Sequence, residues 1–461
     1  MVDCKRHQII TLYVTLLTVK GVGHEVVKFI KSAFLVHFVA VVFLLSACTG
    51  SVNAACGGGK NHFIFATWAA GDELKEFNEI VRQVNENAGG EYTIETLSIP
   101  SDYYIKISTL ISSKNTPDFF WMTQELISKY AELGAIADLT DALNNSEKYK
   151  PERFYEGVIA SAFHEGKYYG IPWIANPVMV YYNKNLFDEA GVPYPDPVDD
   201  WTWDEFIEIA KKLTVVKKDA NNNDYRQYGT VIDGWPNIET FIWAGGGDII
   251  ADNGTDILLD REESLKGLDI LNEILVSGIT PSFSEVSSLG SNNVWFEKQR
   301  AAMFMGGIQD NFEKKIAKLP EDQQFEIGYA PMPVGLDGSA HAFDWTASTV
   351  MDVACSNNPV ALKALEAMTD GFLKWKIASP LRGEVSEVAN IDPLKEAALP
   401  TIEESLRIAR SANYIPEWNE INNRLWVELY SGMLNNPGEF DYRSKAKEIA
   451  VYARELIAER K

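Results

Sequence analysis

The sequence is poor in the residues from which catalytic and metal sites are usually built. Its 461 residues include four cysteines, with no CxxC pair, and six histidines, none of which forms an HExxH motif. It also lacks GxSxG, the turn that carries the nucleophile of many serine hydrolases. The sequence therefore suggests neither a disulfide framework nor a zinc cluster, and it gives no support to a zinc peptidase or a serine hydrolase.

Basic residues and long apolar runs are also scarce. Lysine and arginine together number 42, against 65 aspartates and glutamates, and the formal net charge is −23. An acidic surface repels nucleic acid and anionic lipid headgroups, so no nucleic-acid partner is expected. No apolar run reaches the roughly 20 residues that are needed to span a bilayer.

A shorter apolar run near the N-terminus has the layout of an export signal. Residues 33–47 read AFLVHFVAVVFLLSA, follow Lys28 and Lys31, and end in small residues before Cys48. The segment LSAC at 45–48 resembles the bacterial lipobox, which implies cleavage before Cys48 and a lipid on its thiol. Residues 1–47 are therefore predicted to be a signal peptide. The alternative is ordinary cleavage after Ala55, which would leave the protein without an anchor.

The segments on either side of the signal are less usual. Residues before about Val27 contain a second apolar stretch that an export signal does not need, and an upstream start that is not the natural one would explain it. Residues 48–61 are small, polar and rich in glycine, which is typical of a flexible linker. Folding is expected to begin near His62.

From His62 onward, strand and helix patterns alternate. FIFATW at 63–68 reads as a buried strand, apolar residues then recur at helical spacing over 74–84, and YTIETLSI at 92–99 reads as the next strand. This alternation predicts an α/β fold with parallel strands and helices on the faces of the sheet. The chain is longer than a single core usually grows, so two domains are expected.

Helix starts can be located by their capping residues. Thr202 with Glu205 and Asp260 with Glu263 fit the spacing of a capping box. Asn358 before a proline fits an N-cap that is followed by proline at the first helical position.

Two short segments resemble a phosphate-binding loop and a calcium-binding loop, but neither has the complete motif. Gly57 to Lys60 lacks the spacing of a phosphate loop. Asp219, Asn221 and Asn223 have the alternating spacing of a calcium loop, but Asp224 stands where glycine is required. A solvated turn is the interpretation we adopt, and no metal site is predicted.

The twelve tryptophans are the most informative residues for function, because several follow the ends of predicted strands. Ligands of open α/β sheets bind at those strand ends. A sugar ring presents an apolar face to an aromatic ring and its hydroxyl groups to amides and carboxylates. The pattern favours a carbohydrate ligand, and the alternative for each tryptophan is a place in the core.

Four segments, in this order, carry a family resemblance: IPWIANPVMVYYNKNLFDEAGV at 171–192, TWDEF at 202–206, FEKQRAAMFMGG at 296–307 and YAPMPVG at 329–335. From about His62 to its C-terminus the chain resembles the extracellular solute-binding proteins of ABC importers, in the family of maltose-binding protein.

The resemblance implies a two-lobed fold in which each lobe is a mostly parallel sheet flanked by helices. It places the N-terminal lobe at 62–174 and 331–376 and the C-terminal lobe at 175–330 and 377–461. The lobes are joined by a hinge with three crossings, near 171–176, 326–332 and 374–380.

The resemblance also implies a function. The chain is expected to be the extracytoplasmic substrate-binding component of an ABC transporter, which captures a carbohydrate, expected to be an oligosaccharide, between its lobes and delivers it to the membrane permease. It is expected to be a monomer, anchored to the cell membrane as a lipoprotein through Cys48, with no cofactor, no metal and no enzymatic activity.

Ten residues are expected to line the cleft by this resemblance: Trp68, Asp72, Trp121, Gln124, Asn176, Trp235, Gln309, Asp310, Trp345 and Trp418. Trp418, in YIPEW, is the expected stacking platform. Gln309 stands where maltose-binding protein has an aromatic residue and Asn176 where it has a carboxylate, which puts maltose itself in doubt.

Two other classes of function remain open. A receptor for a polyol phosphate should present arginine, lysine or a helix N-terminus, and a receptor for a polyamine should present several carboxylates. The ten residues include no arginine and only two carboxylates, so a neutral sugar is favoured. A secreted carbohydrate-active enzyme would need two facing carboxylates roughly 5 to 10 Å apart.

Overall fold

The computed structural model describes residues 56–460, except 199, 220 and 377. The predicted signal peptide and Cys48 lie outside the described residues. Among the described helices, none combines the length and the apolar character that a membrane crossing requires.

A central sheet organises the fold. Its strands are β1 (His62–Thr67), β2 (Thr93–Ser98), β3 (Phe119–Thr123), β6 (Ile171–Asn183), β9 (Met303–Gly307), β10 (Ile327–Ala330), β11 (Ala342–Met351) and β12 (Ala409–Arg410). The order is β10-β6-β11-β3-β1-β2, with β9 paired to β6 and β12 to β11. Two hairpins stand apart: β4 (Phe163–His164) with β5 (Lys167–Tyr168), and β7 (Val215–Lys218) with β8 (Asp224–Gln227).

Helices surround this sheet. The first group comprises α3 (Gly71–Asn87), α4 (Tyr103–Ser112), α5 (Gln124–Glu132), α6 (Thr140–Asn145), α7 (Glu156–Ala160), α8 (Lys184–Ala190), α9 (Trp203–Leu213), α10 (Ile238–Ala244) and α11 (Glu262–Val276). The second comprises α12 (Phe283–Leu289), α13 (Asn292–Glu297), α14 (Phe312–Ile316), α15 (Pro359–Phe372), α16 (Glu387–Ile391), α17 (Leu399–Arg407), α18 (Trp418–Arg424), α19 (Ser431–Asn435) and α20 (Tyr442–Glu459). The α/β class is confirmed.

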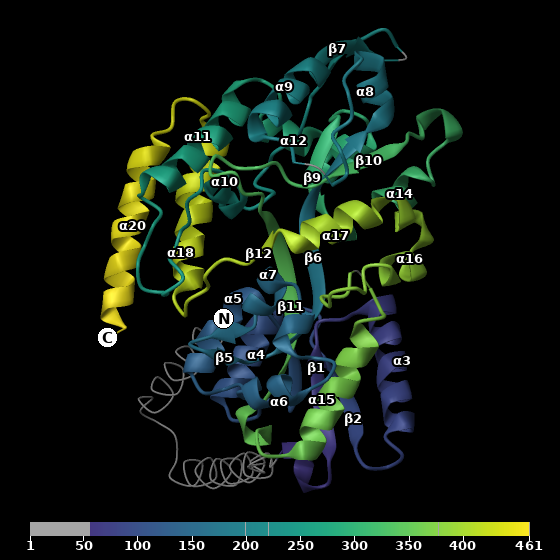
Figure 1. Ribbon diagram of the computed structural model, residues 1–461, viewed down its shortest axis with the longest axis vertical. Helices are drawn as coiled ribbons and strands as arrows, with labels where there is room; N and C mark the ends of the chain where they lie inside the picture. The colour runs from purple at the N-terminus through teal and green to yellow at the C-terminus, as the bar shows by residue number, and fades with distance from the viewer. Residues whose placement is uncertain (1–55, 199, 220, 377, 461) are drawn as a thin grey trace, which may run out of the picture. The chain divides into compact units, whose positions relative to one another are not determined.

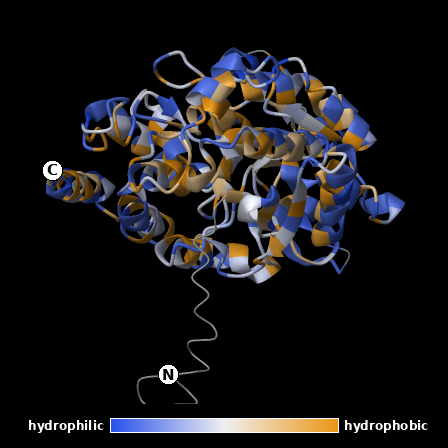
Figure 2. Ribbon diagram, turned by 90° about the horizontal axis from the view of Figure 1, so that it is seen from below, coloured by the Kyte–Doolittle hydropathy of each residue, from blue (hydrophilic) through white to orange (hydrophobic). Residues whose placement is uncertain are grey.

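Short turns of other helix types connect these elements. The 3-10 turns are η1 (Cys56–Gly59), η2 (Pro151–Arg153), η3 (Ile308–Asp310), η4 (Glu321–Gln323), η5 (Val353–Cys355) and η6 (Pro393–Ala398), and η7 (Leu425–Tyr430) is a π-helix. Figure 2 shows that apolar and polar residues alternate along the helical ribbons, as expected of helices with one face on the core.

The strand pairing is more mixed than the expected parallel sheets. β1 runs parallel to β2 and β3, whereas β11 runs antiparallel to β3 and β6. All thirteen residues of β6 are buried, its first half pairs with β11, and its second half pairs with β9 and β10. A single long strand therefore joins two groups of strands, which explains why its sequence is apolar almost throughout.

Buried apolar side chains gather in four clusters. Two draw mainly on residues 63–174 and 347–381, and two mainly on 155–343 and 378–457. Trp345 packs at the border of one cluster from each pair. Figure 1 shows the same grouping, with α15 lying beside α3 although the sequence separates them widely.

One segment departs from the expected lobe division. The backbone N–H of Val334 donates to Trp201 O, and that of Leu336 donates to Ala244 O, each at 2.7 Å. Residues 331–341, expected in the N-terminal lobe, thus contact residues expected in the C-terminal lobe. The boundaries themselves stay a prediction.

The start of the folded region differs from the expected linker. Cys56 and Cys355 form a disulfide, with their Cα atoms 5.0 Å apart, and the backbone N–H of Gly57 donates to Oδ1 of Asp118 at 2.8 Å. The expectations of no disulfide and of a flexible linker are therefore wrong for residues 56–61. The two cysteines are separated by 299 residues in sequence, so no spacing rule could have paired them.

The predicted caps give mixed results. Thr202 and Glu205 form the capping box of α9, and Asn358 caps α15. Asp260 does not cap a helix, because Arg261 takes the N-cap position of α11. The Asp260 carboxylate instead binds the guanidinium of Arg454 at 2.6 Å and 2.8 Å.

Candidate functional site

Two consecutive glycines allow polar side chains to approach the backbone of β9. A methyl group on Gly306 would overlap Oδ2 of Asp310, and one on Gly307 would overlap the amide of Asn176. The sequence MGG at the end of β9 therefore lets a carboxylate and an amide lie directly against the strand. Asp310 belongs to η3, which follows the strand without a break.

These side chains border a cavity of about 450 Å³. The residues that line it are Asn176, Asp233, Gly234, Trp235, Asn292, Phe304, Gly307, Gln309, Asp310 and Trp426. They supply two indole rings, one phenyl ring, three amides and two carboxylates. No lysine, arginine or histidine is among these lining residues.

The aromatic part of the lining depends on a glycine in the left-handed region. Gly234 has φ +108°, and a methyl group there would overlap the indole of Trp426. Trp426 lies in the π-helix η7, a helix type that often occurs at functional sites, and it is 43% exposed. Trp235 is half-buried and its ring meets that of Phe343 edge-on, with the centroids 6.0 Å apart.

Hydrogen bonds hold the amides in place. Oδ1 of Asn176 accepts from the backbone N–H of Gln309 at 3.2 Å, and the backbone N–H of Asn176 donates to Oδ1 of Asp344 at 2.8 Å. Nδ2 of Asn292 donates to Oδ1 of Asp233 at 2.8 Å. The polar lining is therefore ordered by the protein itself.

The two carboxylates of the lining are poorly solvated. Burial raises the pKa of Asp310 to about 6, although Lys315 and Lys395 act in the opposite direction. Burial also raises the pKa of Asp233. Each of the two lysines has a glutamate partner of its own, at 2.6 Å and 2.8 Å.

Six of the ten predicted residues come together. Asn176, Trp235, Gln309 and Asp310 line the cavity. Trp345 lies opposite Asn176 in the β6–β11 register, and its ring centroid is 6.4 Å from that of Trp68.

The other four do not line the cavity, although the ring centroid of Trp121 is 4.6 Å from that of Trp68. Asp72 is exposed and pairs with Lys75 at 2.8 Å. Trp121 has no exposed surface and stacks on Trp173 at 4.7 Å, so it belongs to the core. Trp418 is 1% exposed and is also part of the core, where it meets Tyr414 edge-on.

Gln124, the fourth of these residues, links three elements. Its Oε1 accepts from both the backbone N–H and the hydroxyl of Thr346 at 2.8 Å, and its Nε2 donates to the hydroxyl of Tyr414 at 2.8 Å. Gln124 and Tyr414 line a second cavity of about 460 Å³.

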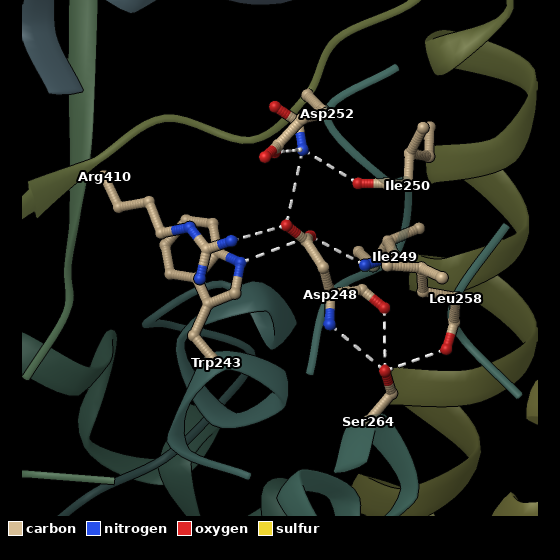
Figure 3. Close-up of polar contacts among 9 residues, drawn as sticks. Trp243, Asp248, Ile249, Ile250, Asp252, Leu258, Ser264 and Arg410 are labelled. Carbon is tan, nitrogen blue, oxygen red and sulfur yellow. Dashed lines mark hydrogen bonds and ion pairs between the residues drawn. The ribbon is translucent and has the colours of Figure 1, made fainter. Parts of the chain in front are cut away.

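Figure 3 shows how the chain that leads to Tyr414 is fixed. Arg410 lies over the ring of Trp243 and binds the carboxylate of Asp248 at 2.6 Å. Nδ2 of Asn413 donates to Ile250 O at 2.8 Å. Burial raises the pKa of Asp248, and the charge of Arg410 opposes that rise. This network attaches the segment after β12 to the loop between α10 and α11.

Four side chains of the lining were not predicted from the sequence: Asp233, Asn292, Phe304 and Trp426. Asp233 could have been proposed from the sequence, because it stands two residues before Trp235, which was itself predicted to line the cleft. Trp426 follows Trp418 by eight residues, and the sequence contains no feature that ranks it above Trp418.

Two groups of potential metal ligands occur among the described residues. One consists of Cys56, Asp118 and Cys355, and the sulfur atoms of its two cysteines already form the disulfide. The other is formed by Glu132, His164 and Glu165, where Glu132 also pairs with an arginine at 3.1 Å. Neither group borders the 450 Å³ cavity. That cavity is suited to binding a polar solute by stacking and hydrogen bonding.

Comparison with known proteins places this geometry in context. The sequence model of one family, described as bacterial extracellular solute-binding protein, matches residues 70–370. A protein of Brucella abortus named as a binding protein is 25% identical over 348 residues, which cover 74% of this chain and 81% of that protein. The erythritol/L-threitol-binding protein of Mycolicibacterium smegmatis is 24% identical over 361 residues, which cover 71% of this chain and 68% of that protein.

The fold is similar to that of a solved sugar-binding protein, MalE from Xanthomonas citri. The TM-score is 0.71 at 19% identity, and the match covers 87% of this chain and 98% of that one. The likeness confirms a two-lobed fold.

Proposed function

The chain belongs to the bacterial extracellular solute-binding protein family, and we propose that its cavity between Trp235, Trp426 and Asp310 captures a carbohydrate. We expect this carbohydrate to be an oligosaccharide. The chain is the solute-binding component of an ABC transporter and acts outside the cytoplasm. It hands the captured solute to the membrane permease.

The observation that carries the proposal is the lining of the cavity. Indole rings can stack on the apolar face of a sugar ring, and amides and carboxylates can bind its hydroxyl groups in pairs. Ligand pockets typically combine aromatic walls with a few fixed polar groups, as this cavity does. The relative that binds erythritol and L-threitol supports a polyhydroxylated solute.

A phosphorylated solute fits less well. The lining of the cavity contains no cationic side chain. A neighbouring cavity of about 270 Å³ shares Gln309 and includes Lys314, Lys376 and Lys395. Each of these lysines already pairs with a carboxylate, at 3.1 Å, 2.6 Å and 2.8 Å respectively. A phosphate would have to compete with these carboxylates for the lysines.

The lobes and hinge belong to the same proposal. We place residues 331–341 with the C-terminal lobe, because their backbone bonds to that part of the chain, and we place a crossing in the first half of β11. The first crossing is β6, and the third remains near 374–380. Solute contacts with both lobes would shift the population toward a closed form.

Membrane attachment through Cys48 is also part of the proposal. Residues 49–55 stand in the sequence between Cys48 and the disulfide at Cys56. Mass spectrometry of the mature protein from the membrane fraction tests this: a diacylglyceryl group on Cys48 supports it, and an N-terminus after Ala55 refutes it.

A carbohydrate-active enzyme is the second candidate, because Asp233 and Asp310 border the same cavity. We propose that the chain performs no catalysis, in line with its family of binding proteins. Incubation with neutral oligosaccharides tests this point, since release of shorter products would refute it.

A thermal-shift screen tests the binding proposal. The protein without residues 1–47, and with Cys48 replaced by alanine, is screened against neutral mono- and oligosaccharides, sugar phosphates and polyamines. A rise in melting temperature with a saccharide, reduced in Trp426→Ala, is the expected result. A rise with phosphates alone would refute the carbohydrate assignment and leave the receptor class intact.

A further inference from the structure

The two carboxylates of the 450 Å³ cavity have no cation of their own. Asp233 is half-buried, and its donors are neutral: Nδ2 of Asn292 at 2.8 Å and the backbone N–H groups of Trp235 and Asn292. Asp310 is half-buried beside Gly306. Among the described residues that line the cavity, none is a lysine, an arginine or a histidine.

The charged groups around these carboxylates are engaged elsewhere. Lys315 and Lys395 are the cations that act on Asp310, and each of them forms an ion pair with a glutamate. Glu313, the partner of Lys395, adds a repulsion. No charged side chain is among the described groups that act on Asp233. Burial raises the pKa of the Tyr430 hydroxyl, and the negative charge of Asp233 adds to that rise.

A solute that fills the cavity would remove the remaining water from both carboxylates. Burial of an ionised carboxylate is costly unless a cation or strong donors replace the water. The described lining supplies neutral donors to both carboxylates and no cation, so a cation that balances their negative charge would have to come from the solute. Two indole rings border the same cavity, and aromatic faces attract cations.

From these contacts we propose that the solute carries a protonated amine beside its hydroxyl groups, which makes the ligand an amino sugar or an amino polyol. The amine lies between Asp233 and Asp310, and the hydroxylated part contacts Trp235 and Trp426. This inference rests on the proposed function of the same cavity and narrows its ligand class.

The test compares solutes that differ in one group. Isothermal titration at about pH 6.5, where Asp310 is largely ionised, uses three pairs: glucosamine with glucose, the β-1,4 glucosamine dimer with cellobiose, and glucamine with sorbitol. The N-acetylated forms of the first two amines retain the position of the nitrogen and remove its charge. Spermidine represents an amine without hydroxyl groups.

The expected result is that an amine form binds about tenfold or more tightly than both its hydroxyl and its N-acetyl counterpart, as for one added charge-assisted hydrogen bond. Asp310→Asn and Asp233→Asn should each reduce this ratio to about threefold or less. Asp322→Asn, an exposed aspartate away from the cavity, is the matched control and should retain the ratio.

The remaining outcomes distinguish a failure of the amine inference from a failure of the proposed function. If a neutral or N-acetylated member binds as tightly as its amine in every pair that binds, the inference is overturned and the proposed function stands. If spermidine alone binds, the amine remains and the carbohydrate class is overturned. If no member binds, both proposals fail. The comparison uses the unmodified protein, so it does not depend on the stability of the variants.

Discussion

Loss of the disulfide between Cys56 and Cys355 should lower the stability of the protein by a predictable amount. The bond attaches the first turn of the folded region to η5, which precedes α15. It therefore closes a loop of 299 residues. Loop-closure entropy for that length corresponds to roughly 5 to 6 kcal/mol at 25 °C, an upper value for an unstrained bond. Native disulfides typically contribute about 2 to 5 kcal/mol when measured, so a loss of about 3 kcal/mol is expected on reduction.

Differential scanning calorimetry checks this expectation. For a chain of this size, a loss of about 3 kcal/mol corresponds to a fall of about 3 to 4 °C in the melting temperature. The Cys56→Ser variant should show this fall without reductant, and the unmodified protein should show it only with reductant. The variant itself should not respond to reductant.

A thiol titration provides the control. The folded, unreduced protein without Cys48 should expose no reactive thiol from Cys56 or Cys355, and reduction should release both. A melting temperature that changes by less than about 1 °C on reduction would refute the reasoning, since the turn at Cys56 would then hold without the bond.

Three further predictions concern the site and the buried acids. Trp426→Ala should raise the Kd for the bound sugar by roughly tenfold with little change in melting temperature. Trp418→Ala should instead lower the free energy of unfolding by about 3 to 5 kcal/mol, because this ring is buried in the core. Titration calorimetry measures the first effect and thermal unfolding the second. Gly306→Ala should weaken sugar binding because its methyl group would displace Asp310, and an unchanged Kd would refute the role of that glycine. Burial raises the pKa of Glu239 to about 7, so the folded state holds this proton more tightly than the unfolded state, and stability is lost as the pH rises from about 4.5 to about 7. Glu239→Gln should therefore stabilise the protein by about 3 kcal/mol at pH 8 and hardly at pH 4, and a gain that does not depend on pH would contradict this cause.

Much of the fold could be predicted because local patterns and tertiary packing agree. The apolar segment at 171–183 becomes the buried strand β6, and the capping signals at Thr202 and Asn358 act as their residue types predict. The signal at Asp260 failed because a distant arginine, Arg454, binds its carboxylate more favourably than the helix N-terminus does.

The site was only partly predictable, for two physical reasons. One wall of the cavity comes from the loop 233–235, and the other walls come from elements far apart in the sequence, so their meeting depends on tertiary packing. Trp418 begins α18 and is buried, whereas Trp426 lies where the helix changes to the π-helix η7 and is 43% exposed. Helical periodicity of 3.6 residues cannot show that change.

A crystal structure of the protein with the saccharide selected by the thermal-shift screen tests the central claim most directly. We expect a sugar ring against Trp426 or Trp235, with polar groups of the solute within hydrogen-bonding distance of Asp233 or Asp310. A saccharide bound instead in the cavity of Gln124 and Tyr414, with the first cavity empty, would contradict it.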